Sequence, residues 1–242
     1  MPFVLSAAAV AVALRQTPDH PTSGVIAVVL VALSFLPSLF ARHRVRQLLR
    51  SGDVQAVLGA WSRALGQLPH PETMGPLVAA AAFAACGWID QGRRALERAV
   101  RGPAWEIALE HRLFVETMLD AFEGDREAAL AKAERLARMP LPPAGPLVRA
   151  RVRVLRDALG AFARAFAHTS AARDVALLEK AARRSPLVHW AMRYAAAVVA
   201  IDHGDEATAR RLIGEAPAWP RESAFHAFHA ELGARIGLPA RA

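Results

Sequence analysis

Two histidines near the carboxyl end are the first residues whose spacing suggests chemistry. His226 and His229 are three residues apart, so they can share one face of a helix, and Glu231 follows closely. A catalytic zinc site of the His-Glu-x-x-His type needs a four-residue spacing with an internal glutamate, and the chain lacks that motif. Two ordinary histidines are the favoured interpretation, and a metal-dependent enzyme with a site near this pair is the alternative.

A stretch rich in carboxylates offers a second possible chemistry. Acid–base catalysis needs a carboxyl group whose pKa is raised in a cleft, beside a second group that stays ionised. Carboxylates spread along a helix are instead expected to form a solvated face. The chain has no phosphate-binding glycine loop, nucleophile elbow or Cys–His pair, so we predict no catalytic residue, cofactor or metal site. The acidic residues are Glu106, Glu110, Glu116, Asp120, Glu123 and Asp125.

Arginines supply a third candidate site. Arg149, Arg153, Arg156 and Arg164 have spacings that put them on one face of a helix. Such a face can bind anionic lipid headgroups or an acidic partner, and a solvated surface is the alternative. The net charge of +8 is divided between two basic blocks, 42–102 and 141–184, with an acidic block between them. Because this is not one continuous basic stripe, we expect no nucleic-acid partner.

The amino-terminal region is apolar enough to enter a membrane. No charged residue occurs from 21 to 41, and residues 24–41 predict a transmembrane helix of roughly 30 Å. Arginines directly after it mark the cytoplasmic side. Residues 3–14 are a shorter apolar segment, interpreted as a first span, a re-entrant segment or a cleaved signal. The arginine-rich, asparagine-free composition is typical of a GC-rich genome. We therefore expect a bacterial inner-membrane protein whose carboxy-terminal domain is cytoplasmic.

The rest of the chain predicts helices only. The single cysteine, Cys86, excludes an internal disulfide. Short polar residues stand where helices should begin, at Asp53, Asp90, Asp125, Ser170 and Asp205. The predicted helices are Asp53–Gln67, Glu72–Ala85, Asp90–Arg101, Ala104–Glu123, Asp125–Arg138, Pro146–His168, Ala171–Arg184, Leu187–Asp202, Asp205–Glu215 and Arg221–Ile236.

Four glycines recur at a spacing typical of helical repeats. Gly52, Gly87, Gly124 and Gly204 are separated by 35, 37 and 80 residues, and the last step is two periods of 40. A proline follows about seventeen residues after each glycine, at Pro69, Pro103, Pro140 and Pro220. Gly52, Gly124 and Gly204 are also expected to end the preceding helices.

This spacing resembles the tetratricopeptide-repeat family. That family places a small residue five positions after the hairpin glycine, a large apolar residue at nine and a small one at twelve. The corresponding residues are Val57, Trp61 and Ala64; Gly92, Leu96 and Ala99; Ala129, Ala133 and Leu136; and Ala209, Ile213 and Ala216. The third set exchanges its large and small members, and the aromatic signature of the family's first helix is missing.

With the helical composition and the apolar amino-terminal segments, the resemblance implies an all-α fold, an α-solenoid of about four to five hairpins preceded by one or two transmembrane helices. It divides the chain into an anchor at 1–41, a repeat block at 42–140 and a second block with a capping helix at 141–242. Carried over from the family, the partner-groove residues are His111, Phe114, Met118, Phe122 and Tyr194. The lysine and asparagine of a carboxylate clamp are absent from the groove positions, so an apolar peptide groove is expected. The alternative is that these apolar residues belong to the core.

Together these patterns predict a membrane-anchored, cytoplasm-facing scaffold that binds a protein partner and is not an enzyme. A structural factor for assembling membrane complexes is the second possibility. The partner, the pathway and the oligomeric state are left open.

Overall fold

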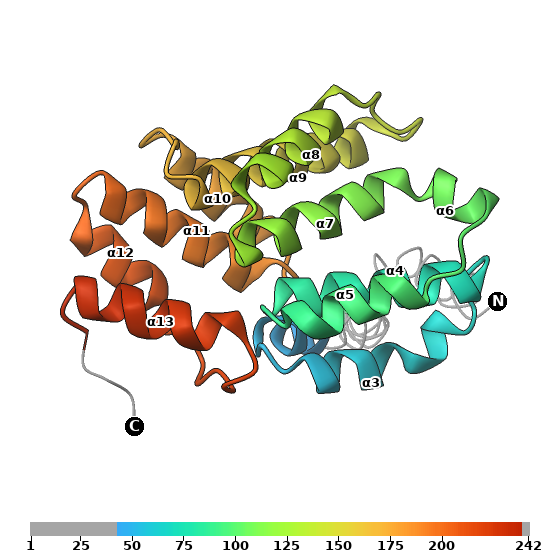
Figure 1. Cartoon of the computed structure of the whole chain (residues 1–242), viewed down its shortest axis with the longest axis horizontal. Helices are drawn as coiled ribbons and strands as arrows, with labels where there is room; N and C mark the ends of the chain where they lie inside the picture. Colours follow the sequence, from blue (N-terminus) through green and yellow to red (C-terminus); the bar gives the residue numbers. More distant parts are fainter. Residues whose placement is uncertain (1–42, 239–242) are drawn as a thin grey trace, which may run out of the picture. The chain divides into compact units, whose positions relative to one another are not determined.

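The structure is a computed structural model that describes residues 43–238, and the regular structure in that range is helical, without a strand (Figure 1). The all-α class is therefore confirmed for the described residues. The chain divides into two compact units, Met1–Gln47 and Leu48–Ala242, and helices α3 to α13 belong to the second. The apolar segments 3–14 and 24–41 lie outside the described residues. Within 43–238, no helix combines the length and the apolarity needed to cross a bilayer.

The helices follow the predicted order closely. They are α3 (Val54–Leu65), α4 (Pro71–Ala85), α5 (Ile89–Arg98), α6 (Pro103–Ile107), α7 (Leu109–Glu123), α8 (Arg126–Arg138), α9 (Pro146–Phe166), α10 (Asp174–Arg184), α11 (His189–Asp202), α12 (Glu206–Ile213) and α13 (Ala224–Arg235). Residues 43–50, before α3, are helical as well. One prediction was wrong in detail, because the helix expected over Ala104–Glu123 is broken at Ala108 into α6 and α7. At this break the carbonyl of Trp105 accepts a hydrogen bond from Arg112.

The hairpin turns use the predicted glycines. Gly52, Gly87, Gly124 and Gly204 have φ between 74° and 87°, a left-handed conformation that disfavours other residues. Gly87 is restricted twice, because a Cβ there would lie 2.9 Å from the hydroxyl oxygen of Ser223. The helices that follow three of these turns are capped as expected. The side chains of Asp53, Asp125 and Asp205 each accept a hydrogen bond from a backbone N–H in the first turn.

Two predicted caps were wrong. Asp90 lies inside the first turn of α5, whose N-cap residue is Trp88. Ser170 precedes α10 by four residues, and the N-cap residue there is Arg173. Asp174 instead accepts from the backbone N–H of Ala171, so that turn is closed by a different side chain. A short polar residue near a helix start is not enough when the backbone enters the helix at another position.

Helices pack mainly against their neighbours in sequence, as in α4 on α5, α7 on α8 and α11 on α12. Ten of the twelve residues matched to the repeat pattern are buried, and the exceptions are Trp61 and Ala64. Gly92 explains why small residues are needed, because a Cβ there would lie 2.9 Å from a methyl carbon of Leu119. The structure thus confirms packing at these positions, whereas a tetratricopeptide-like solenoid stays a prediction.

The carboxy-terminal segment returns to the first hairpins. The hydroxyl of Ser223 donates to the carbonyl of Cys86 at 2.7 Å, across 137 residues of sequence. Beside it, the backbone N–H of Ala224 donates to the carbonyl of Gly87 at 2.8 Å. Figure 1 shows the loop before α13 next to the ends of α3 and α4. The sequence had predicted a capping helix here, but not that it would join the two ends of the series of hairpins.

Candidate functional site

The candidate site is a cavity of about 240 Å³ bounded by residues of α7, α9, α11 and α13. Aromatic and aliphatic residues line it together with a second set that is mostly charged, and the second set is called the rim. The apolar lining is Ala121, Phe122, Phe166, Tyr194, Val198, Ile201, Phe228 and Leu232, and the rim is Gly124, Arg126, His168, Asp202, Glu231 and Arg235. Because these residues come from helices distant in sequence, the cavity exists only in the folded chain.

Three phenylalanines form one wall of the cavity. The ring of Phe122 lies 5.4 Å from that of Phe166 and 5.8 Å from that of Phe228, and the latter two rings are 5.4 Å apart. Phe122 is buried, whereas Phe166 and Phe228 are only partly buried. The partly buried rings give the cavity an apolar surface on which another aromatic or aliphatic group can pack.

The rim holds one histidine–carboxylate contact, one ion pair and, among the described residues, one arginine without an ion pair. The Nδ1 atom of His168 is 2.8 Å from a carboxylate oxygen of Asp202, and Arg235 donates to Glu231 at 2.7 Å. Among the described residues, the guanidinium of Arg126 makes no hydrogen bond or ion pair. The charged side chains of the rim can therefore bind polar groups of a ligand, such as backbone amides. The guanidinium of Arg126 is available to bind an anionic group.

Tyr194 anchors the deep end of the cavity. Its hydroxyl accepts a hydrogen bond from the indole N–H of Trp219 at 2.7 Å and lies 3.0 Å from Nδ1 of His229. Its ring stacks on Phe225 with the centroids 4.8 Å apart. All three partners come from the carboxy-terminal segment, so that segment positions the tyrosine. His229 is thus engaged by Tyr194 rather than paired with His226, which is exposed.

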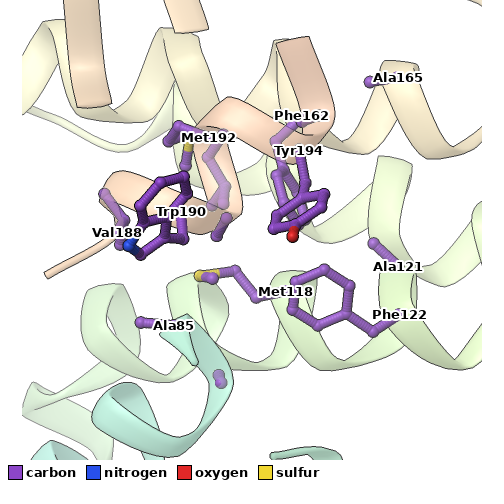
Figure 2. Close-up of a cluster of buried hydrophobic side chains, with 14 of the residues drawn as sticks. Ala85, Met118, Ala121, Phe122, Phe162, Ala165, Val188, Trp190, Met192 and Tyr194 are labelled. Atoms are coloured by element: carbon purple, nitrogen blue, oxygen red, sulfur yellow. The ribbon is translucent and has the colours of Figure 1, made fainter. Parts of the chain in front are cut away.

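The predicted groove residues are divided between core and surface. Figure 2 shows Met118 and Phe122 of α7 facing Trp190 and Tyr194 of α11. Met118, Phe122 and Tyr194 are buried, with exposed fractions of 0%, 8% and 0%. Phe114 is partly buried and His111 is exposed. Met118 is therefore a core residue, as the alternative interpretation expected. Phe122 and Tyr194 are also buried in the core, but they line the cavity as well.

The predicted anionic-ligand arginines are not four free cations. Arg149 and Arg153 are exposed. Arg156 is buried and donates to Glu110 and to the carbonyls of Met139 and Pro140. Arg164 makes a two-pronged contact with Asp174. Burial by itself raises the pKa of Asp174, but Arg164 and the N–H of Ala171 outweigh it and hold that pKa below its ordinary value.

The acidic stretch is likewise more than the solvated face expected from sequence. Asp120 is 3% exposed and lies between Arg93 of α5 and Lys132 of α8. Glu123 also accepts from Arg93, and this hydrogen bond is the main reason that the pKa of Arg93 is raised. With Glu110 bound to Arg156, these carboxylates join α7 to α5, α8 and α9. These three carboxylates are therefore paired with cations.

The metal alternative receives no support from the described residues. In residues 43–238, no three side chains of histidine, cysteine, aspartate or glutamate come together in a way that could hold a metal ion. The arrangement that does occur is a cavity lined by both apolar and charged residues, which suits binding of a group with an apolar body and a polar edge.

Sequence reasoning missed most of the cavity. Phe166, Phe228 and His168 were not singled out, because their partners come from other helices. The only local signal was the spacing of Phe225 and Phe228, three residues apart in α13, which places both rings toward one side of the helix. Comparison with protein-family models, with curated proteins and with solved structures found no match for this chain.

Proposed function

We propose that the chain is a non-catalytic, membrane-anchored scaffold that binds a protein partner through the cavity between α7, α9, α11 and α13. The observation that carries this proposal is the aromatic wall beneath a rim of mixed charge. Such a surface suits an aromatic or aliphatic side chain whose neighbouring backbone amides and charged groups reach Arg126, Asp202 and Glu231.

The size of the cavity favours a side chain over a small-molecule substrate. Ligand pockets in proteins are typically about 300–1,000 Å³. The cavity here is about 240 Å³, which suits one or two anchoring side chains of a longer segment. An anchor side chain in an apolar pocket, surrounded by polar contacts, is the usual arrangement of a protein-binding hot spot.

The place of this scaffold is proposed from the sequence. Residues 24–41 form the anchor, and the arginines that follow put the helical domain on the cytoplasmic side of a bacterial inner membrane. Protease added to intact spheroplasts should leave the helical domain uncut, and lysis should expose it. Digestion of the domain from outside would refute this orientation.

Site-specific photocrosslinking in the native host tests the binding site. A photoreactive amino acid at Arg126, on the rim, is compared with one at Ala137, which is exposed about 16 Å further along the same helix. We expect a discrete crosslinked product from position 126 alone. The substitution Ile201→Phe, which fills the cavity, should remove that product without lowering the amount of protein.

Two results would contradict the proposal. One is the same crosslinked product from positions 126 and 137, which would indicate nonspecific proximity. The other is an unchanged product in Ile201→Phe, which would show that the partner does not enter the cavity.

A further inference from the structure

The first two turns of α9 are exposed all the way around. Residues 145–151 are all exposed, although a helix that rests on a neighbour buries every third or fourth residue. Leu147 is 79% exposed and Val148 is 49% exposed. Ala158 and Leu159, eleven residues later and so on the same side of the helix, are 0% exposed. The side of α9 that packs into the core is therefore exposed to solvent where the helix begins.

Three arginines accompany these exposed apolar residues. Arg149, Arg151 and Arg153 are exposed, and in residues 43–238 none of their side chains forms an ion pair or a hydrogen bond. The sequence has no acidic residue between Glu134 and Asp157. The amino-terminal part of α9 thus carries three positive charges that are not paired with a carboxylate among the described residues.

A hollow of about 190 Å³ lies beside this part of the helix, between α9 and the end of α10. Arg151 of α9 and Arg184 of α10 both line it, and both are exposed, so the hollow is open to a ligand that approaches from solvent. An aliphatic lining with two arginines suits a group that has hydrocarbon next to a negative charge. The other lining residues are Val152, Val154, Leu155, Ala181 and Ser185.

An anionic lipid surface matches this combination of apolar and basic side chains. In such a surface, hydrocarbon lies directly beneath a layer of negatively charged headgroups. A helix in the interface therefore buries its apolar side chains while its arginines extend to the headgroups. The proposed anchor ends at residue 41 and the second compact unit begins at Leu48, so only a short segment tethers the helical domain to a bilayer. This last step rests on the proposed function, whereas the charge and the exposure do not.

We propose that the amino-terminal part of α9, residues 146–155, docks on the surface of a bilayer that contains anionic phospholipid. Leu147 and Val148 enter the boundary of the hydrocarbon, and Arg149, Arg151 and Arg153 bind lipid headgroups. Docking holds the helical domain, and with it the partner-binding cavity, in one orientation on the membrane.

The test follows the environment of position 148 in the full-length protein. A polarity-sensitive fluorophore is attached to Val148→Cys, since Cys86, the only native cysteine, is buried. The protein is reconstituted into phosphatidylcholine vesicles with or without phosphatidylglycerol. We expect a blue shift of the emission, and quenching by lipids with brominated acyl chains, only when phosphatidylglycerol is present. The control is Ala207→Cys, an exposed position beside Glu206 in the first turn of α12, which should show neither effect.

Two triple variants, each made in the labelled Val148→Cys protein, separate the location of the arginines from the total charge. The first replaces the three arginines of α9, and the second replaces three other exposed arginines that also lack an ion pair among the described residues. We expect the first to lower the equilibrium constant for docking by about a hundredfold, about fivefold for each arginine at the membrane surface, and the second to leave it unchanged. The substitutions are Arg149→Gln, Arg151→Gln and Arg153→Gln in the first, and Arg94→Gln, Arg98→Gln and Arg221→Gln in the second.

The proposal is overturned if phosphatidylglycerol leaves the emission at position 148 unchanged, or if the second triple variant loses as much docking as the first. A blue shift that is already complete in detergent also overturns it, because another segment of the chain or a second copy would then cover this face. Flotation with pure phosphatidylcholine vesicles reports the anchor alone, and crosslinking at position 126 reports the partner. The proposed function and the docking of α9 can therefore fail separately.

Discussion

Replacement of Phe225 by alanine should separate the two ends of the helical series. Phe225 is 0% exposed, stacks on Tyr194 at 4.8 Å and packs edge-on against Trp219 at 4.9 Å and Phe122 at 5.4 Å. Its removal leaves a hole at the centre of the contact between α13, α7 and α11. A buried Phe→Ala change costs about 3–5 kcal/mol of unfolding free energy, and each lost aromatic pair accounts for about 0.5–1.5 kcal/mol of it.

We expect a loss of about 4 kcal/mol, toward the middle of that range, because the adjoining cavity already limits how well the site can close. Urea unfolding of the full chain in mild detergent, followed by tryptophan fluorescence, measures it. With a slope of about 2 kcal/mol per molar urea, the midpoint should fall by about 2 M. Ile107→Ala is the control, because Ile107 is 84% exposed and its loss should cost less than about 0.5 kcal/mol.

Hydrogen exchange then shows where the loss occurs. The backbone N–H of Ala224 donates to the carbonyl of Gly87. Its protection from exchange therefore reports directly on the contact between the carboxy-terminal segment and the first hairpins. In Phe225→Ala this amide should exchange faster, while the amide of Leu178, inside α10, should keep its protection. The reasoning is refuted if the midpoint shifts no more than in Ile107→Ala, or if the exchange of Ala224 is unchanged.

Three further predictions concern charged and reactive groups. Arg156→Met leaves Glu110 and two carbonyls without their donor, so the unfolding free energy should fall by about 3–5 kcal/mol, against almost no change for Arg149→Gln in the same urea titration. The pKa of Asp174 is lower in the folded protein than its ordinary value of 3.8, so the pair with Arg164 stabilises the fold above pH 3.8. This stabilisation is lost as the pH falls from 3.8 through the pKa of the folded protein. The unfolding free energies of the wild-type and Asp174→Asn proteins should therefore converge in acid. Burial, aided by the charge of Asp53, raises the pKa of the Cys86 thiol to about 12, so iodoacetamide at pH 8 should modify it only in urea, and modification of the folded protein would contradict this burial.

Local chemistry accounts for the parts of the fold that sequence predicted well. Gly124 and Asp125 end one helix and begin the next because glycine adopts the left-handed turn and the aspartate accepts a hydrogen bond from Ala128. Gly204 adopts the same left-handed turn, and Asp205 accepts a hydrogen bond from the backbone N–H of Thr208. Such features depend on residues within one turn of each other. The sequence pattern did not predict the break between α6 and α7, where Arg112 donates to the carbonyl of Trp105 seven residues earlier.

The candidate site was much less predictable. Phe122 and Tyr194 were selected as groove residues, and they do line the cavity. Phe166, Phe228 and His168 were missed, because each depends on which helices pack together. The contacts of the predicted arginine stripe were unpredictable for a related reason, since Arg156 and Arg164 pair with carboxylates on other helices. Spacing places residues on one face of a helix but does not say what covers that face.

The amino-acid sequence alone determined the helical class, the order of the helices and the turns that join them. These features follow from short-range effects, namely the backbone freedom of glycine, the capping of free N–H groups by aspartate and the 3.6-residue period of apolar side chains. The tertiary structure decided that Ser223 and Phe225 return to Cys86, Gly87 and Tyr194. It also gathered Arg50 beside Trp190. Both results arise from burial of apolar surface between segments some 140 residues apart, which no local pattern encodes.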